Sequence, residues 1–248
     1  MPESCFFCKT IMSIRRIFNA TPLCFESWSS SVVVQPIAFL EAAGFVRQHH
    51  YARGIHNGPT LCCGLYNGPR LIGVCAFATP CSEAVRSSVF GQDRKATVTE
   101  LHRLVILDET PTNAESWFIA RSLAFLRQLK SHIEAVVSFA DEGRGHRGVI
   151  YQASNALYYG AARGEHAYQD AEGRLRHRRQ CGHNVTLTEA QDRGWTPAST
   201  GRKHRYCLLL GRDRRHSRQL LGDVRLERYD YPKPLGVTNG AGIAHPVT

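Results

Sequence analysis

Hydrophobic residues recur along the chain at two spacings, one typical of helices and one typical of strands. Apolar positions over residues 37–45 follow the helical spacing and predict an amphipathic helix that runs toward His50. Two apolar runs, at residues 60–66 and 71–78, flank Asn67-Gly68, a residue pair that strongly favours a tight hairpin turn. We therefore expect a helix followed by a β-hairpin.

The next segments continue the alternation of strands and helices. Residues 97–107 alternate and are rich in Val, Ile and Leu, which predicts a strand. Thr112-x-x-Glu115 has the form of a capping box, and the apolar stripe that follows predicts a helix over residues 112–130. A buried strand is expected at residues 133–140.

A loop rich in Gly and Arg, at residues 143–148, separates that strand from a predicted helix over residues 149–159, closed by Gly160. Short strands are expected within residues 167–178 and at residues 204–210. This order predicts an α/β (α+β) fold with a mixed, mostly antiparallel central sheet flanked by helices.

Composition agrees with a soluble, cytoplasmic protein. The 248 residues are 43% hydrophobic, which is enough for a core, and no apolar stretch is long enough to cross a membrane. The nine cysteines are odd in number and scattered, so reduced thiols are the simpler interpretation. We expect one domain at residues 31–235, between an N-terminal appendage at 1–30 and a C-terminal tail at 236–248.

Positive charge is concentrated in one part of the chain. Lys and Arg number 31 against 21 acidic residues, and residues 171–218 hold twelve of the basic side chains but only four of the acidic ones. A charge run is often only a solvated face, but this imbalance favours contact with the phosphates of nucleic acid. The residues predicted to bind DNA are Arg174, Arg176, Arg178, Arg202, Lys203, Arg205, Arg214 and Arg215.

Three residues near the ends or middle of predicted elements are candidates for chemistry. Asp141 ends a strand, where open α/β sheets place reactive groups, although an aspartate that caps its own loop is the simpler alternative. Arg103 lies within an apolar strand, and a buried guanidinium needs a carboxylate or phosphate partner. Ser116 lies in the first turn of a predicted helix, where free amides favour phosphate, but a plain helix start fits equally well.

Other motifs are less specific. Gly143-x-Gly145-x-x-Gly148 has the spacing of a dinucleotide-binding loop, but it comes late in the chain and holds two Arg and a His, so we interpret it as a flexible basic loop. His49-His50-Tyr51 ends the first predicted helix, and a histidine pair alone does not define a metal site. Cys5-x-x-Cys8 is only half of a zinc pattern.

Six short segments are distinctive in combination: Glu100-Leu101-His102-Arg103-Leu104, Asn113-Ala114-Glu115-Ser116, Ser138-Phe139-Ala140-Asp141, Tyr151-Gln152-Ala153-Ser154-Asn155, Lys203-His204-Arg205-Tyr206 and Tyr231-Pro232-Lys233. Together they closely resemble the Mom family of adenine-modification proteins of Mu-like bacteriophages. The resemblance extends over about residues 36–235.

The resemblance implies a fold like that of the GNAT-type N-acetyltransferases. It implies an enzyme that adds a carbamoylmethyl (acetamido) group to N6 of adenine in phage DNA, so that host restriction enzymes fail to recognise their sites. It further implies double-stranded DNA with a flipped adenine as substrate and acetyl-CoA as donor, bound by Arg103 and Ser116. The residues carried over as catalytic are His50, Tyr51, Arg103, Ser116, Asp141 and Tyr151.

The implied product places a demand on the donor. An ordinary acetyltransferase joins an amine to the carbonyl carbon of a thioester, whereas this product joins N6 to what would be the methyl carbon. That carbon is not electrophilic in acetyl-CoA, so a redox metal is the simplest addition. Iron held by His50, Asp141 and a phenolate oxygen of Tyr51 or Tyr151 fits the ligand types available. A donor with a preformed leaving group would remove that need.

Two alternatives stay open at this point. An ordinary GNAT-type N-acetyltransferase would acetylate an amine or a protein and would need no metal. A non-catalytic basic DNA-binding protein would tolerate the replacement of Asp141 and Tyr151. The sequence also leaves the oligomeric state open, with a homodimer among the possibilities.

Overall fold

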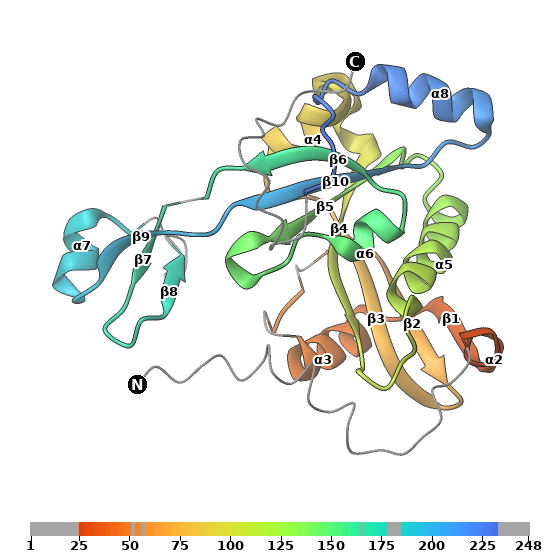
Figure 1. Cartoon of the computed structure of the whole chain (residues 1–248), viewed down its shortest axis with the longest axis horizontal. Coiled ribbons are helices and arrows are strands. Elements are labelled where there is room, and N and C mark those ends of the chain that lie inside the picture. The colour runs from red at the N-terminus through yellow and green to blue at the C-terminus, as the bar shows by residue number, and fades with distance from the viewer. Residues whose placement is uncertain (1–24, 51–52, 56–57, 165, 178–184, 233–248) are drawn as a thin grey trace, which may run out of the picture. The chain divides into compact units, whose positions relative to one another are not determined.

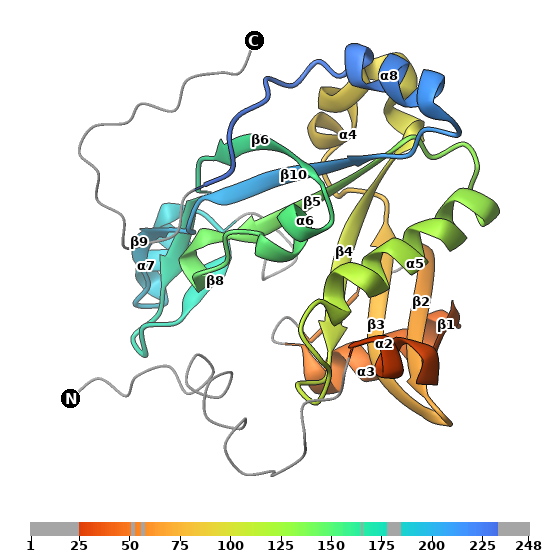
Figure 2. The same cartoon turned by 45° about the vertical axis from the view of Figure 1, so that its right-hand side comes forward.

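The computed structural model describes residues 25–50, 53–55, 58–164, 166–177 and 185–232. The chain divides into two compact units. Unit 1 lies within residues 1–81 and 99–133, and unit 2 lies within residues 82–98 and 134–248. Figures 1 and 2 show the helices and strands of each unit.

Unit 1 is built on four strands that pair in the order β1-β2-β3-β4, each antiparallel to its neighbour. The β2–β3 hairpin places Asn67 opposite Arg70, and Gly68 takes a positive φ of 57°, as the Asn-Gly turn predicts. Its elements are α2 (Phe25–Ser31), β1 (Val32–Pro36), α3 (Phe39–His49), β2 (Pro59–Asn67), β3 (Arg70–Ala78), β4 (Val98–Ile106) and α5 (Ala114–Leu129).

The core of unit 1 lies on both faces of its sheet. On one face, Cys62 of β2 packs with Phe45 and Val46 of α3. The next residue, Cys63, points the other way, toward Ser122 of α5. Burial raises the pKa of both thiols to about 11, so they remain protonated and act as small apolar side chains. The buried cysteines of the described residues, Cys62, Cys63, Cys75 and Cys207, are free thiols.

Unit 2 contains three strands that pair antiparallel in the order β5-β10-β6, and a separate small sheet in the order β8-β7-β9. Its elements are α4 (Glu83–Phe90), η2 (Gln92–Thr97), β5 (Ala135–Asp141), η3 (Glu142–Arg144), α6 (Val149–Ala153), β6 (Leu157–Ala162), β7 (His166–Gln169), β8 (Leu175–His177), α7 (Leu187–Asp192), β9 (Thr196–Ser199), β10 (Lys203–Leu209) and α8 (Arg214–Asp223).

The two faces of β5-β10-β6 differ in chemistry. Tyr159 and Cys207 face a core that includes Phe90 of α4 and Leu220 of α8. Because side chains alternate along a strand, the preceding residues, Tyr158 and Tyr206, point to the opposite face, where Tyr151 of α6 lies. We call this second face, with its tyrosines and His204, the tyrosine face.

The structure confirms a mixed α/β fold with largely antiparallel strands flanked by helices. It also confirms the helix before the hairpin, the hairpin itself, strands β4, β5 and β10, and the β7–β8 hairpin. Among the described residues, no helix is both long and apolar enough to cross a membrane. The limits of the single domain at residues 31–235 stay a prediction.

Two predictions are wrong. The helix expected over residues 149–159 ends at Ala153, because Asn155 takes a positive φ of 58° and the following residues join the sheet as β6, opposite β10. The expected Thr112 capping box is absent from this described segment. The N-cap of α5 is Asn113, which has a left-handed backbone and makes no side-chain capping bond.

Candidate functional site

The predicted catalytic residues fall into both units. His50, Arg103 and Ser116 belong to unit 1, and Asp141 and Tyr151 belong to unit 2. Tyr51 lies outside the described residues. Each unit is therefore described by itself.

In unit 2, Asp141 is the last residue of β5 and holds the loop that follows. Its carboxylate oxygen Oδ1 accepts a hydrogen bond of 3.0 Å from the backbone nitrogen of Gly143. Its carbonyl oxygen accepts another, also 3.0 Å, from the backbone nitrogen of His146. The capping role expected as the simpler alternative is thus present, and it leaves the second carboxylate oxygen, Oδ2, for other partners.

Tyr151 is buried on the tyrosine face, where four tyrosine rings lie together. Its ring centre is 5.4 Å from that of Tyr206, which is in turn 5.1 Å from Tyr158 and 6.4 Å from Tyr231. The Tyr206 hydroxyl donates to the carbonyl of Arg147 and accepts from the amide of Gln152 at 3.1 Å. Burial raises the pKa of Tyr206 to about 12, so its hydroxyl stays protonated.

The glycine-rich loop fits against this cluster. Gly148 has a positive φ of 74°, and a Cβ built there would lie 2.3 Å from a carbon of the Tyr206 ring. Only glycine allows both the conformation and the close approach. The last glycine of the Gly-x-Gly-x-x-Gly pattern therefore has a packing reason in this fold.

His204 is a functional candidate that sequence reasoning missed. Its imidazole is buried beside Tyr206 on the same face of β10, and its Nδ1 lies 2.8 Å from the Tyr158 hydroxyl. Its Nε2 is 3.9 Å from Oε1 of Glu142, a carboxylate that Arg202 holds through bonds of 2.7 and 3.0 Å. Burial lowers the pKa of His204, so the neutral ring is favoured. The available signal was the His-x-Tyr alternation at residues 204 and 206.

In unit 1, the predicted residues make local contacts. His50 follows the last turn of α3 and donates from its backbone nitrogen to the Val46 carbonyl at 2.9 Å. The Arg103 guanidinium donates from Nε to the Gly54 carbonyl at 2.8 Å and from Nη1 to the His102 carbonyl at 2.7 Å. The Ser116 hydroxyl donates to the Asn113 carbonyl at 3.1 Å. Two of the donors of Arg103 thus bind backbone carbonyls, and its role as a site residue stays a prediction.

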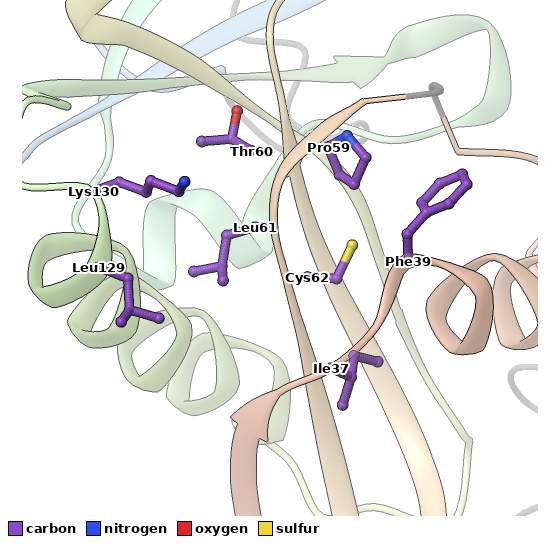
Figure 3. A pocket seen from close by; sticks show the side chains of 8 residues that line it. All are labelled: Ile37, Phe39, Pro59, Thr60, Leu61, Cys62, Leu129 and Lys130. Atoms are coloured by element: carbon purple, nitrogen blue, oxygen red, sulfur yellow. The ribbon is translucent and has the colours of Figure 1, made fainter.

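An apolar hollow of about 450 Å³ also lies in unit 1 (Figure 3). Lys130, after the end of α5, supplies its one charged side chain. The lining residues are Ile37, Phe39, Pro59, Thr60, Leu61, Cys62, Leu129 and Lys130, so none of the predicted site residues lines it.

The predicted iron ligands do not form a ligand set in the described part of the chain, which contains no group of three or more His, Cys, Asp or Glu side chains arranged to hold a metal. In unit 2, the Asp141 carboxylate accepts a backbone hydrogen bond through one of its two oxygens. Iron at these residues therefore stays a prediction.

The predicted DNA-binding residues divide into paired and exposed side chains. Arg174 and Arg176 both bind the Asp170 carboxylate, which is 5% exposed, at 2.8 and 2.7 Å. Arg202 is paired with Glu142. Half-buried side chains include Lys203 and Arg205, whose guanidinium lies 5.8 Å from the Phe139 ring centre. Arg178 lies outside the described residues.

Arg214 and Arg215 begin α8 and are exposed, and among the described residues neither forms an ion pair with a carboxylate. Arg218, one turn later, is exposed as well. The helix thus presents cationic side chains whose charge is not neutralised by the described acids.

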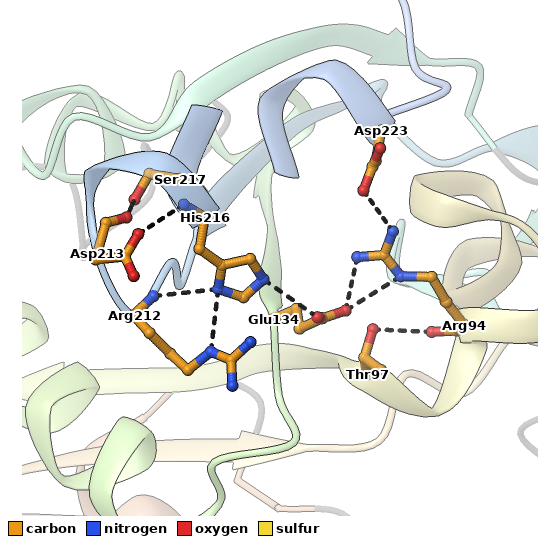
Figure 4. Close-up of polar contacts among 8 residues, drawn as sticks. All are labelled: Arg94, Thr97, Glu134, Arg212, Asp213, His216, Ser217 and Asp223. Carbon is orange, nitrogen blue, oxygen red and sulfur yellow. Dashed lines mark hydrogen bonds and ion pairs between the residues drawn. The ribbon is translucent and has the colours of Figure 1, made fainter. Parts of the chain in front are cut away.

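Ion pairs fix α8 to the rest of unit 2 (Figure 4). Glu134 binds Arg94 at 2.7 Å and faces Nε2 of His216 at 3.5 Å, and Arg94 also binds Asp223, near the end of α8, at 2.7 Å. Asp213 caps the helix, because its carboxylate accepts a hydrogen bond of 2.7 Å from the backbone nitrogen of His216. The exposed arginines therefore stand on a helix held at both ends.

Comparisons with known proteins give a family and a fold likeness. The profile of the Mom protein family matches residues 31–233. The methylcarbamoylase mom of Escherichia phage Mu is 32% identical over 150 residues, which are 60% of this chain and 61% of that protein. The chain therefore matches somewhat less than two thirds of the length of this curated relative.

Solved structures of acetyltransferases are similar at low identity. The spermidine/spermine N-acetyltransferase SpeG from Vibrio cholerae has a TM-score of 0.44 and 9% identity, over 78% of this chain and 97% of that chain. The putative acetyltransferase yncA from Salmonella typhimurium, solved with acetyl-CoA, has a TM-score of 0.45 and 8% identity. The match covers 74% of this chain and 96% of that chain.

Proposed function

Because the chain belongs to the Mom protein family, we propose that it is a DNA-modifying transferase that adds a carbamoylmethyl group to N6 of adenine and so protects phage DNA from host restriction enzymes. The match of that family's profile over residues 31–233 is the observation that carries the proposal. The name of the phage Mu relative, a methylcarbamoylase, agrees with it.

Unit 2 supplies features that suit a base taken from a DNA duplex. N6 lies inside the base stack, so the adenine has to be flipped into a pocket before chemistry. Tyr151 belongs to a cluster of tyrosine rings, the kind of side chain on which bases stack, and Tyr231 at its edge is 44% exposed. Asp141, at the end of β5, offers a carboxylate oxygen that can accept a hydrogen bond from the exocyclic amine.

For DNA binding, we assign the phosphate contacts first to Arg214 and Arg215 of α8. Their side chains are exposed and carry charge that the described acids do not neutralise. Arg174, Arg176 and Arg202 already hold carboxylates, so a phosphate would have to compete with Asp170 or Glu142. The exposed pair on α8 avoids that cost.

The donor is a separate part of the proposal. Acetyl-CoA remains the donor implied by the sequence resemblance, with Arg103 and Ser116 as its expected contacts. Both side chains also donate to backbone carbonyls, so they fit a role in shaping unit 1 at least as well. We therefore derive no step through coenzyme A or through iron, whose ligands are not assembled among the described residues.

Mass spectrometry of nucleosides tests the proposed function directly. Plasmid DNA from bacteria that express this chain is expected to contain deoxyadenosine heavier by a carbamoylmethyl group, and to resist several unrelated restriction enzymes. DNA from cells that carry the empty vector is the control. Unmodified deoxyadenosine with soluble protein present would refute the proposal, and acetylated amines or protein would favour an ordinary acetyltransferase.

Iron is tested on the same samples. If iron takes part, purified protein contains it, and His50→Ala loses both the metal and the modification. Full modification by protein that elemental analysis shows to be free of metal would point to a donor with a preformed leaving group.

A further inference from the structure

His204 is a buried ionisable group that the proposed function leaves without a role. Only 4% of the residue is exposed, and its Nε2 is buried and makes no hydrogen bond within the described structure. A buried imidazole nitrogen without a hydrogen-bond partner is costly for the folded state. A position of this kind is therefore a candidate for function.

The surroundings of His204 define its protonation state. The Tyr158 hydroxyl and Nδ1 of His204 share a hydrogen bond of 2.8 Å, and burial raises the pKa of the Tyr158 phenol, so it keeps its proton and can donate it to Nδ1. With Tyr158 as the donor, the ring proton of the neutral imidazole is on Nε2, which lies 3.9 Å from Oε1 of Glu142. Glu142 favours a positive charge on this ring, whereas burial and the guanidinium groups of Arg202 and Arg147 oppose it.

Tyrosine, histidine and carboxylate thus stand in the order of an activated hydroxyl, its base and a group that orients the base. The carboxylate of Glu142 is ionised and fixed by Arg202 through two hydrogen bonds. This arrangement can stabilise an imidazolium that forms only during a reaction.

We propose that Tyr158, His204 and Glu142 form a proton relay that takes up the proton released when N6 of adenine bonds to carbon. The inference rests on the proposed function. The Tyr158 ring is 5.1 Å from Tyr206, which is 5.4 Å from Tyr151, so the relay shares the tyrosine face with the residue assigned to the base.

The step balances with a carbamoylmethyl donor that carries a leaving group. The N6 lone pair forms the new N–C bond, and the leaving group departs with the electron pair of its bond to carbon. The N6 proton passes to the Tyr158 oxygen while the Tyr158 proton passes to Nδ1 of His204. Tyr158 contacts the substrate, whereas His204 and Glu142 act through it and are positioning residues.

The test measures modification as a function of pH. Purified full-length protein is mixed with plasmid DNA and a deproteinised extract of bacterial cells as the source of donor, and modified deoxyadenosine is quantified between pH 5 and pH 9. The wild-type rate should fall as pH drops through the pKa of His204, because the protonated ring cannot accept the proton. Tyr158→Phe should be at least ~100-fold slower and should lose this dependence, since general acid–base catalysis typically contributes 10²–10⁴-fold.

Tyr168→Phe is the matched control. It also removes the hydroxyl of a buried tyrosine, but that hydroxyl donates to the Val185 carbonyl at 3.3 Å, and the described structure shows no hydrogen bond from it to a titratable group. Its rate should stay within about threefold of wild type and keep the pH profile. His204→Gln should reproduce the loss seen in Tyr158→Phe.

The outcomes separate the relay from the proposed function. If wild-type protein modifies adenine and Tyr158→Phe keeps its rate and its pH profile, the relay is wrong and the proposed function stands. If wild-type protein produces no modified adenine, the proposed function is wrong. If His204→Gln does not fold, ¹⁵N NMR of His204 in the wild-type protein replaces it: a proton on Nε2 supports the relay, and a proton on Nδ1 overturns it.

Discussion

The Nε atom of Arg103, on β4, donates a hydrogen bond of 2.8 Å to the carbonyl oxygen of Gly54, in the segment that follows α3. A guanidinium in the middle of an apolar strand thereby holds the chain a few residues after His50. Nη1 also donates, to the His102 carbonyl at 2.7 Å, so the planar group bridges two backbone segments. A single ammonium group lacks this fork geometry.

Removal of this guanidinium should loosen the segment after α3. In Arg103→Ala, the amides of Gly54 and Ile55 should exchange with deuterium at least ~10-fold faster, since a hydrogen bond from a charged donor contributes about 1.5–3 kcal/mol. In Arg103→Lys, these amides should exchange at a rate between those of wild type and Arg103→Ala. Hydrogen-exchange mass spectrometry checks this, with peptides from α8 as the internal control. Equal exchange in all three proteins would contradict the positional role.

Two substitutions separate the loop-capping role of Asp141 from its chemical role. Asp141→Asn keeps an oxygen that can accept from the Gly143 nitrogen, so the free energy of unfolding should change little. Asp141→Ala loses the cap and should cost about 1 kcal/mol. Modification should be abolished in both, because both lose the carboxylate, while the affinity for duplex DNA is retained. Full modification by the asparagine variant would restrict Asp141 to the structural role.

The exposed arginines of α8 should control the affinity for DNA. Replacement of both Arg214 and Arg215 by alanine should weaken binding to all sequences alike and reduce the slope of log K against log salt by about 0.9 for each phosphate that the variant no longer neutralises. Arg174→Ala is the matched control, because Arg174 already binds Asp170. It should change the salt slope less. Fluorescence anisotropy with labelled duplexes measures both, and a larger effect of Arg174→Ala would reverse the assignment.

Asp170 should make the small sheet of unit 2 sensitive to acid. Burial raises its pKa, but the backbone nitrogen of Arg174 and the guanidinium groups of Arg176 and Arg174 outweigh that effect and bring the pKa to about 2. A carboxyl with a lowered pKa stabilises the fold above its unfolded pKa of 3.8, and that stability is lost as pH falls through 2. Asp170→Asn should unfold at a lower temperature than wild type at neutral pH. Between pH 4 and pH 2 its unfolding temperature should change less with pH than that of wild type. An unchanged pH profile would contradict this.

Local sequence patterns predicted much of unit 1 because its elements are adjacent in the chain. The Asn-Gly turn and the apolar runs beside it determine the β2–β3 hairpin without distant partners. The prediction of a helix over residues 149–159 was wrong because its second half depends on a partner that is distant in the sequence. Leu157 and Tyr158 join a strand because β10, almost fifty residues later, offers Cys207 and Tyr206 as pairing partners.

The site was only partly predictable for the same physical reason. Asp141 and Tyr151 stay predicted site residues, and α8 was interpreted from its charge alone, since only Leu220 of that helix is buried. The ion pairs that hold it, to Arg94 and Glu134, join residues far apart in the sequence. His204 was missed because its partners, Tyr158 and Glu142, are likewise distant in the chain.

The end of β6 and the start of β10 are joined by a long segment of the chain. Ala162 and Lys203 are opposite each other in the β6–β10 ladder, so everything in residues 163–202 departs from and returns to one rung of the sheet. Each doubling of the length of such an excursion costs only about 0.6 kcal/mol of closure entropy. Insertions or exchanges that keep Arg202, whose side chain holds Glu142, can change this stretch without moving that rung, which makes it the natural place for descendants of one ancestor to acquire different target preferences.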